Sequence, residues 1–206
     1  MKVMLLNGSP RGEKCTYTAL SVIAKRLNEL GIDTEIFNVG AKPLAGCIGC
    51  GTCRTNGKCF VDDGVNEFVS KMEECDGLIV GSPVYYAAAS GQITSFLDRA
   101  FYSGGGKFAG KLGAAIVSCR RGGASATFDQ LNKYFSISNM PIVTSNYWNQ
   151  VHGNMPEEVL KDEEGLQTMR TLADNMAWLL QCIEAGKEKG INLPQYEAKI
   201  KTNFIR

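Results

Sequence analysis

Short apolar segments alternate with longer amphipathic segments along most of the chain. The short segments are rich in Val, Ile and Leu and are bounded by Gly, Pro, Asn or Asp, which is typical of strands buried on both faces of a sheet. The longer segments repeat their apolar residues with a helical period. The expected strands are residues 2–7, 34–38, 77–81, 112–118 and 141–144, and the expected helices lie at about residues 16–30, 65–74, 91–101, 127–138 and 163–185. This alternation predicts an α/β fold with a doubly wound, five-stranded parallel sheet.

The chain has the length of one domain with a sizeable core. It contains 206 residues, of which 44% are apolar, and no internal repeat or linker divides it. We expect residues 1–185 to form the domain and the polar residues 186–206 to form a tail. In doubly wound sheets, ligands bind at the carboxyl ends of the strands. The segments that follow the strands are therefore where functional residues are expected.

Charge and hydropathy argue against several classes of protein. The net charge of +1, without a basic stripe, argues against nucleic acid as the main partner. No apolar run approaches the length of about 18 residues that a membrane helix needs, and the amino terminus lacks a signal-peptide cleavage pattern. We therefore expect a cytoplasmic protein with no membrane partner. Disulfides are rare in that reducing compartment, so the clustered cysteines among the eight in the chain are candidates for metal or redox chemistry.

The segment after the first expected strand has the features of an anion site. It reads LLNGSPRGEKCTYTAL and leads into a helix, whose first N–H groups and dipole favour negative charge. The hydroxyls of Ser9, Thr16 and Thr18 add possible donors. The segment has neither the GxxxxGK[ST] spacing of a triphosphate loop nor the GxGxxG fingerprint of a dinucleotide loop. A single phosphate monoester fits better, and an ordinary strand-to-helix turn is the alternative.

The segment after the third expected strand offers a surface for a flat ring. It reads GSPVYYAAASGQITSFLDR and presents Val84, Tyr85 and Tyr86 ahead of small residues. A partly apolar ring can lie against such a loop, with backbone N–H groups directed at its edge. The alternative is an aromatic turn that packs against a neighbouring subunit, and the two interpretations are compatible.

These two loops, in this order, resemble those of the flavodoxin-like NAD(P)H-dependent FMN reductases, and especially of their iron-sulfur flavoprotein branch. The similarity extends from Met1 to about residue 185. It implies a three-layer flavodoxin-like fold, FMN as cofactor, NAD(P)H as co-substrate and a homodimer or homotetramer. It also implies that the FMN phosphate is held by Ser9, Arg11, Thr16, Tyr17 and Thr18, and that the isoalloxazine ring is flanked by Pro83, Val84, Tyr85 and Tyr86.

The segments after the fourth and fifth expected strands supply further candidates. Ser118, Arg120, Arg121, Gly122 and Gly123 follow the fourth strand, and guanidinium and backbone N–H groups there can stabilise the negative charge of a reduced flavin. The family resemblance also places this loop beside the ring. An arginine can instead bind the extra phosphate of NADPH or form a surface ion pair.

The only histidine in the chain is expected in the loop after the fifth strand. His152 has an ordinary pKa close to neutrality, so it is a candidate proton donor to a reduced acceptor. A structural or solvent-exposed role is the alternative. Tyr147 and Trp148 in the same loop either cover a flavin from a neighbouring subunit or pack within the protein.

Four cysteines lie close together in residues 46–63. Cys47, Cys50, Cys53 and Cys59 have the spacing C-x2-C-x2-C-x5-C, with glycines between them. Ferredoxin-type loops hold a [4Fe–4S] cluster with comparable spacings, whereas structural zinc usually takes two separated CxxC pairs. The motif also matches that of the iron-sulfur flavoproteins. Redox-active thiols without metal, and zinc, are the alternatives.

The function expected from these features is that of an FMN-dependent oxidoreductase. It passes electrons between NAD(P)H, or reduced ferredoxin, and a quinone, a flavin or another small acceptor, with the cluster as a possible relay. The alternative is a non-enzymatic electron carrier of the flavodoxin type. Such carriers dock on basic partners through a strongly acidic surface, and the near-neutral charge of this chain disfavours that alternative.

Overall fold

The computed structural model describes residues 1–202 and 204. Its strands are β1 (Lys2–Asn7), β2 (Asp33–Asn38), β3 (Gly77–Tyr85), β4 (Ala88–Ala89), β5 (Leu112–Cys119) and β6 (Gln150–His152). Its helices are α1 (Cys15–Glu29), α2 (Thr52–Asn56), α3 (Val65–Glu73), α4 (Gly91–Phe108), α5 (Ala124–Ile137), α6 (Pro156–Val159) and α7 (Glu163–Glu188).

Five of the strands form one parallel sheet in the order β2-β1-β3-β5-β6. This is the doubly wound order of the flavodoxin-like fold, in which the strand order reverses between β1 and β3. The short β4 pairs antiparallel with the end of β3 and closes a hairpin. The predicted fold class is therefore confirmed.

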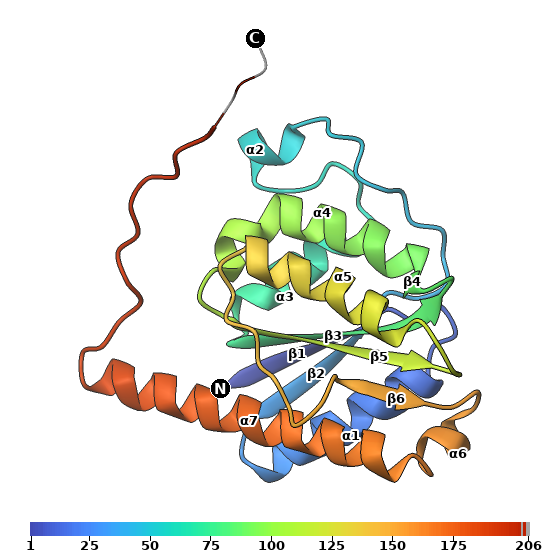
Figure 1. Ribbon diagram of the computed structural model, residues 1–206. Coiled ribbons are helices and arrows are strands. Elements are labelled where there is room, and N and C mark those ends of the chain that lie inside the picture. Colours follow the sequence, from blue (N-terminus) through green and yellow to red (C-terminus); the bar gives the residue numbers. More distant parts are fainter. Residues whose placement is uncertain (203, 205–206) are drawn as a thin grey trace.

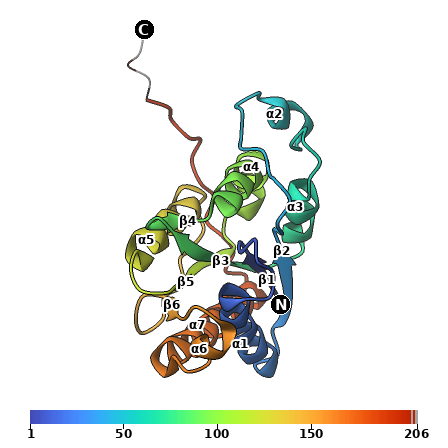
Figure 2. The same ribbon diagram turned by 90° about the vertical axis from the view of Figure 1, so that its right-hand side faces the viewer.

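Helices cover both faces of the sheet (Figures 1 and 2). Strand β1 shows why, because its successive side chains point to opposite faces and both sets are apolar. Met4 and Leu6 belong to the core beneath α3, α4 and α5, whereas Val3 and Leu5 belong to the core beneath α1 and α7. A strand that is buried on both faces reads as a continuous apolar run, which is the pattern that predicted it.

The fifth parallel strand is not where the sequence predicts it. Residues 141–144 make only an isolated bridge, between Ile142 and Gly113, and the strand that pairs with β5 is β6. The chain touches the sheet edge at Pro141, leaves it through an exposed loop and returns where Val117 N donates to Asn149 O. Pro141 has no N–H to extend the ladder. Strand β6 contains one buried apolar residue, Val151, which is too weak a pattern to predict a strand.

Several other boundaries also differ from the prediction. Helix α4 continues to Phe108 through three consecutive glycines, strand β3 continues to Tyr85, α5 begins at Ala124, and α7 continues to Glu188, so the predicted tail 186–206 begins with helix. Residues 191–202 form neither helix nor strand, and Leu193 among them lies against Gly110 (Figure 1). Of that predicted tail, residues 203, 205 and 206 lie outside the described residues. Among the helices that the structure describes, none has the length and hydropathy needed to cross a membrane.

Two glycines of α4 provide a test of how closely the helices pack. A Cβ atom added at Gly104 would lie 2.7 Å from Val69 Cγ1 of α3, whereas one added at the exposed Gly106 would meet no atom within 4 Å. We expect Gly104→Ala to lower the free energy of unfolding by about 1–3 kcal/mol through overpacking. We expect Gly106→Ala to raise it by up to about 1 kcal/mol through helix propensity. Urea denaturation of both variants measures the difference, and equal effects would contradict close packing at Gly104.

Candidate functional site

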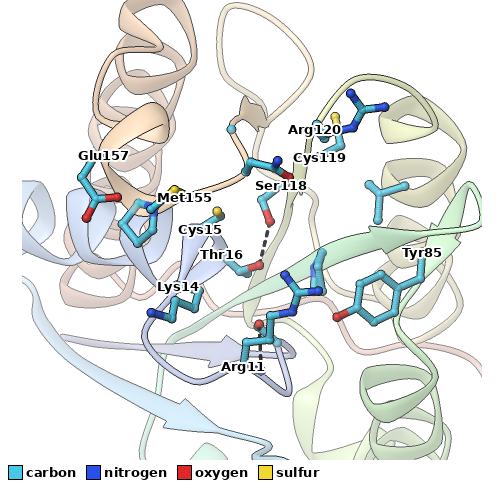
Figure 3. A pocket seen from close by; sticks show the side chains of 16 residues that line it. Arg11, Lys14, Cys15, Thr16, Tyr85, Ser118, Cys119, Arg120, Met155 and Glu157 are labelled. Carbon is cyan, nitrogen blue, oxygen red and sulfur yellow. Dashed lines mark hydrogen bonds between the residues drawn. The ribbon is translucent and has the colours of Figure 1, made fainter.

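A cavity of about 390 Å³ opens at the carboxyl ends of the parallel strands. It lies where the strand order reverses, which is the usual ligand site of this type of sheet. Figure 3 shows its side chains, which come from the ends of β3 and β5 and from the segments that follow β1, β5 and β6. Its lining consists of Ser9, Arg11, Lys14, Cys15, Thr16, Pro83, Val84, Tyr85, Ser118, Cys119, Arg120, Gly153, Asn154, Met155, Pro156 and Glu157.

One end of the cavity has the donors and charges of an anion site. Helix α1 begins there, and its first turn receives no side-chain cap, so its first N–H groups are available to a ligand. The buried Ser9 and the cationic side chains of Arg11 and Lys14 line the same end. Asn7 holds the loop in shape, because its Oδ1 accepts from Ser9 N at 3.1 Å and its Nδ2 donates to Gly12 O at 3.2 Å. The charge and geometry suit a phosphate group.

The floor of the cavity joins two strand ends through hydroxyl groups. Thr16 Oγ1 and Ser118 Oγ lie 2.7 Å apart, and both side chains are buried (Figure 3). The first residue of the loop after β1 also approaches β3 closely, since Gly8 N donates to Gly81 O at 2.8 Å. The loops after β1, β3 and β5 are therefore held together by hydrogen bonds rather than by contacts with a ligand.

The opposite wall is the β3–β4 hairpin, which has an unusual backbone. Its two turn residues, Tyr86 and Ala87, have φ angles of 51° and 59°, as a type I′ turn requires. Asn and Gly normally occupy these positions, so this turn is strained by about 1–3 kcal/mol per residue. Gly123 packs against it, because a Cβ atom at this residue would lie 2.7 Å from Ala87 Cα. The turn is thus supported by the loop after β5.

The cavity brings together about half of the predicted site residues. Ser9, Arg11, Thr16, Pro83, Val84, Tyr85, Ser118 and Arg120 line it. The other candidates, Tyr17, Thr18, Tyr86, Arg121, Gly122, Gly123 and His152, lie outside this lining.

Among the candidates outside the lining, Thr18 and Gly123 have clear local roles, and Tyr86 is exposed. Thr18 lies one turn into α1 and its Oγ1 donates to Lys14 O at 3.2 Å, so its hydroxyl is engaged with the helix. Tyr86 is fully exposed at the tip of the hairpin. Gly123 supports the hairpin, as described above.

His152 does not occupy the predicted loop. It is the last residue of β6, and its Nδ1 lies 3.5 Å from Asp162 Oδ2 in a separate hollow that also includes Tyr147 and Thr168. Asp162 also accepts hydrogen bonds from the backbone N–H groups of His152 and Gly165, and it caps α7. The expected role of His152 as a proton donor stays a prediction, and its side chain lies beside the cap of α7, outside the lining of the cavity.

The sequence analysis missed several residues of the lining. Lys14 precedes α1 and was detectable, because a cation beside a free helix N-terminus strengthens an anion site. Met155 and Glu157 come from the segment after β6, a strand that the sequence did not predict (Figure 3).

Two thiols also line the cavity. Burial raises the pKa of the thiols of Cys15 and Cys119, so both stay protonated at neutral pH.

The four clustered cysteines lie at a second site, beside α4. Cys47, Cys50, Cys53 and Cys59 all line one small, largely apolar cavity of about 80 Å³. Hydrogen bonding to Thr52 holds the pKa of the Cys50 thiol below its ordinary value. In the part of the chain that the structure describes, no three Cys, His, Asp or Glu side chains lie close enough to hold a metal ion. The donor set fits an iron-sulfur cluster in kind, and binding would require the thiols to move closer together.

The family model described as NADPH-dependent FMN reductase matches residues 1–154. The chain belongs to this family. An iron-sulfur flavoprotein of Methanocaldococcus jannaschii is 35% identical over 192 residues, which cover 89% of this chain and 100% of that one. An iron-sulfur flavoprotein of Methanosarcina thermophila is 30% identical over 195 residues, covering 92% and 100%. An FMN reductase (NADPH) of Escherichia coli is 31% identical over 98 residues, covering 48% and 47%.

Solved structures support the fold of this FMN reductase family member. A flavodoxin, WrbA-like protein from Agrobacterium tumefaciens superposes with a TM-score of 0.62 at 15% identity, covering 88% of this chain and 98% of that one. A flavodoxin from the domain Archaea superposes with a TM-score of 0.61 at 15% identity, covering 88% and 99%. The expected flavodoxin-like fold is confirmed. The family supports FMN and NADPH as cofactor and co-substrate, and the cavity fits FMN, with an anion site at one end and an aromatic wall at the other.

The support of the hairpin by Gly123 can be tested with its neighbour as control. Gly123 has a φ angle of 91° and no room for a Cβ atom, whereas a Cβ at Gly122 would meet nothing within 4 Å. We expect Gly123→Ala to shift the hairpin and weaken FMN binding about tenfold, which corresponds to about 1.4 kcal/mol. Gly122→Ala should bind FMN as the wild type does. Fluorescence titration of the apoproteins with FMN measures the dissociation constants of both variants. Unchanged FMN binding by Gly123→Ala would show that the hairpin is not part of the site.

Proposed function

We propose that the protein is an FMN-dependent oxidoreductase that moves electrons between NAD(P)H and a small acceptor such as a quinone or a flavin. The observation that carries the proposal is the cavity at the switch point of the sheet, where an uncapped helix start, three cations and a strained aromatic hairpin meet. Family membership supports the pairing of FMN with NADPH. Bound FMN supplies the redox chemistry, because flavins accept a hydride and release electrons singly or in pairs.

The chain itself binds and orients the cofactor. In this proposal, the N-terminus of α1, Ser9, Arg11 and Lys14 hold the phosphate. Val84 and Tyr85 lie against the ring, and the rigid hairpin keeps that wall in place before binding. Preorganisation of this kind lowers the entropy lost on binding.

Arg120 provides positive charge at the rim of the cavity. It lines the cavity and is exposed, so it is accessible both to a reduced flavin and to the phosphate of a nicotinamide nucleotide. A cation there stabilises negative charge that develops when the flavin is reduced, and thereby favours electron uptake. Acid–base catalysis by His152 has no part in this proposal.

The role proposed for Arg120 is tested by comparing its substitution with that of Arg121, its neighbour in the sequence. We expect Arg120→Ala to weaken FMN binding or raise the KM for NADPH about tenfold, since hydrogen bonds between charged groups contribute about 1.5–3 kcal/mol. Arg121→Ala is the matched control, because Arg121 is exposed and lies outside the cavity lining. Steady-state kinetics with a quinone acceptor and FMN titration measure these constants. Equal behaviour of the two variants would remove Arg120 from the site, and failure of the wild type to oxidise NAD(P)H would favour a carrier of the flavodoxin type.

We also propose that Cys47, Cys50, Cys53 and Cys59 bind a [4Fe–4S] cluster. All four line one cavity, their spacing is compact, and two relatives that match over nearly the whole chain are named iron-sulfur flavoproteins. A cluster would let the protein exchange single electrons with a partner such as ferredoxin. Zinc binding and metal-free redox chemistry are the competing assignments for the same thiols.

Anaerobic purification followed by elemental analysis tests the cluster directly. We expect about four irons and four labile sulfides per chain, with broad absorption near 400 nm beside the flavin bands. Cys53→Ser should lose most of the iron and keep FMN, whereas Cys182→Ser, which changes a cysteine on α7, should keep both. Zinc in place of iron, or flavin without metal, would overturn the cluster assignment and leave the FMN assignment standing.

The expected assembly and location stay predictions. A homodimer or homotetramer is expected from the resemblance, and Tyr147 and Trp148 are each about half exposed, with ring centroids 5.0 Å apart. The ferredoxin partner and the cytoplasmic location are likewise untested expectations.

A further inference from the structure

Arg99 is a buried cation at the base of the four-cysteine loop. It lies in α4, its side chain is 2% exposed, and all five N–H groups of its guanidinium have acceptors. Nη1 donates to Asp63 Oδ2 at 2.6 Å and to Ala45 O at 3.2 Å, and Nη2 donates to Asp63 Oδ1 at 2.6 Å and to Val61 O at 3.0 Å. The fifth, Nε–H, donates to Cys59 Sγ at 3.4 Å.

These acceptors lie at the two ends of one loop. Ala45 comes just before the first cysteine of the motif, and Val61 and Asp63 come just after the last. A single side chain, held on a long helix, therefore joins the beginning and the end of the loop. Hydrogen bonding to Asp63 raises the pKa of Arg99 above its ordinary value, so the charge is permanent. A buried charge without its partner is strongly unfavourable, so the loop is held closed at this point.

The same contacts fix one of the four thiols. Besides the bond from Arg99, both backbone groups of Cys59 are held by Asn66 of α3, with N to Oδ1 at 2.9 Å and Nδ2 to O at 2.8 Å. Cys47 and Cys50 are exposed. Cys53 Sγ makes one contact with the helical framework, as it donates to Tyr102 O of α4 at 3.8 Å. Cys59 is held through both backbone groups and its sulfur, and is thus the most firmly attached of the four.

We propose that Arg99 is the positioning residue of the four-cysteine loop, which it closes through Asp63 and in which it holds the Cys59 thiol in place for the cluster to bind. The part that concerns the cluster rests on the proposed function. Closure of the loop does not, because it follows from the contacts of Arg99 with Asp63 and Cys59 themselves.

The geometry has two consequences. First, lysine cannot replace Arg99, because an ammonium group lacks the planar fork that binds Asp63, Ala45 and Val61 together. Second, the Nε–H group of Arg99 would donate a hydrogen bond to Cys59 Sγ as a sulfur ligand of the cluster. Hydrogen bonds to cluster sulfurs are one of the factors that set the reduction potential, and a cationic donor stabilises the reduced, more negative form. Loss of this donor should therefore make the potential more negative.

The experiment compares the full-length variants Asp63→Asn, Arg99→Lys and Arg99→Gln with the wild type. Asp62→Asn is the matched control, because Asp62 is the exposed neighbour of Asp63. Three quantities are measured: hydrogen exchange of residues 45–63 in metal-free protein, iron per chain after anaerobic purification, and the cluster reduction potential from an EPR-monitored titration. FMN content and circular dichroism report whether each variant is folded.

We expect Asp63→Asn and Arg99→Lys to keep FMN, to exchange the loop amides about tenfold faster and to lose most of the iron. The iron that Arg99→Lys retains should titrate at a more negative potential. Asp62→Asn should match the wild type in every measurement. If Arg99→Gln does not fold, Asp63→Asn still decides the matter, because it removes the charge of the partner and one of its two acceptor oxygens while keeping the size of the side chain.

The outcomes separate this inference from the proposed function. If the wild type binds no iron and the loop still opens in Asp63→Asn, the cluster assignment fails and closure by Arg99 stands. Unchanged loop exchange in both Asp63→Asn and Arg99→Lys would overturn the closure. Wild-type iron content and potential in Arg99→Lys would overturn the role of Arg99 toward Cys59.

Discussion

Burial of the parallel sheet on both faces is the constraint on which the rest of the structure depends. Side chains of the central strands β1, β3 and β5 serve two separate cores, so their polar residues gather near their carboxyl ends and in the segments that follow. Because parallel strands end at one edge, these segments lie together there. The cavity forms at this edge, and its walls continue buried strands. The hydrogen bond between Thr16 of α1 and Ser118 of β5 joins two of these segments.

The two sites of the protein differ in how their positive charges are balanced. The cavity at the carboxyl ends of the strands is lined by the cations Arg11, Lys14 and Arg120, a charge that suits an anionic ligand. The cysteine loop packs on a cation of α4, Arg99, whose charge is balanced by Asp63 of the loop. The first arrangement provides affinity for an anionic cofactor. The second provides a defined loop in which sulfur atoms meet little competing charge.

The sequence predicts most of the fold and only part of the site, for physical reasons. Strands such as β1 and β5 are apolar on both faces and long enough to be recognised. Strand β6 is held by backbone pairing to β5 with a single buried side chain, so its amphipathic pattern carries almost no signal. That error moved His152 into a loop and hid the wall that contains Met155 and Glu157. Likewise, the contact of Arg99 with both ends of the cysteine loop joins residues far apart in sequence, which no local pattern predicts.

The close contact of α3 and α4 links the hydrophobic core to the chemistry of a sulfur atom. Asn66 on α3 holds the backbone of Cys59, and Arg99 on α4 holds its side chain. The two helices approach each other at Gly104 and Val69, without space for an added methyl group. The packing of the two helices thus positions the polar groups around one thiol. A buried apolar substitution at this helix contact can therefore change the surroundings of the Cys59 sulfur without altering any residue that touches it.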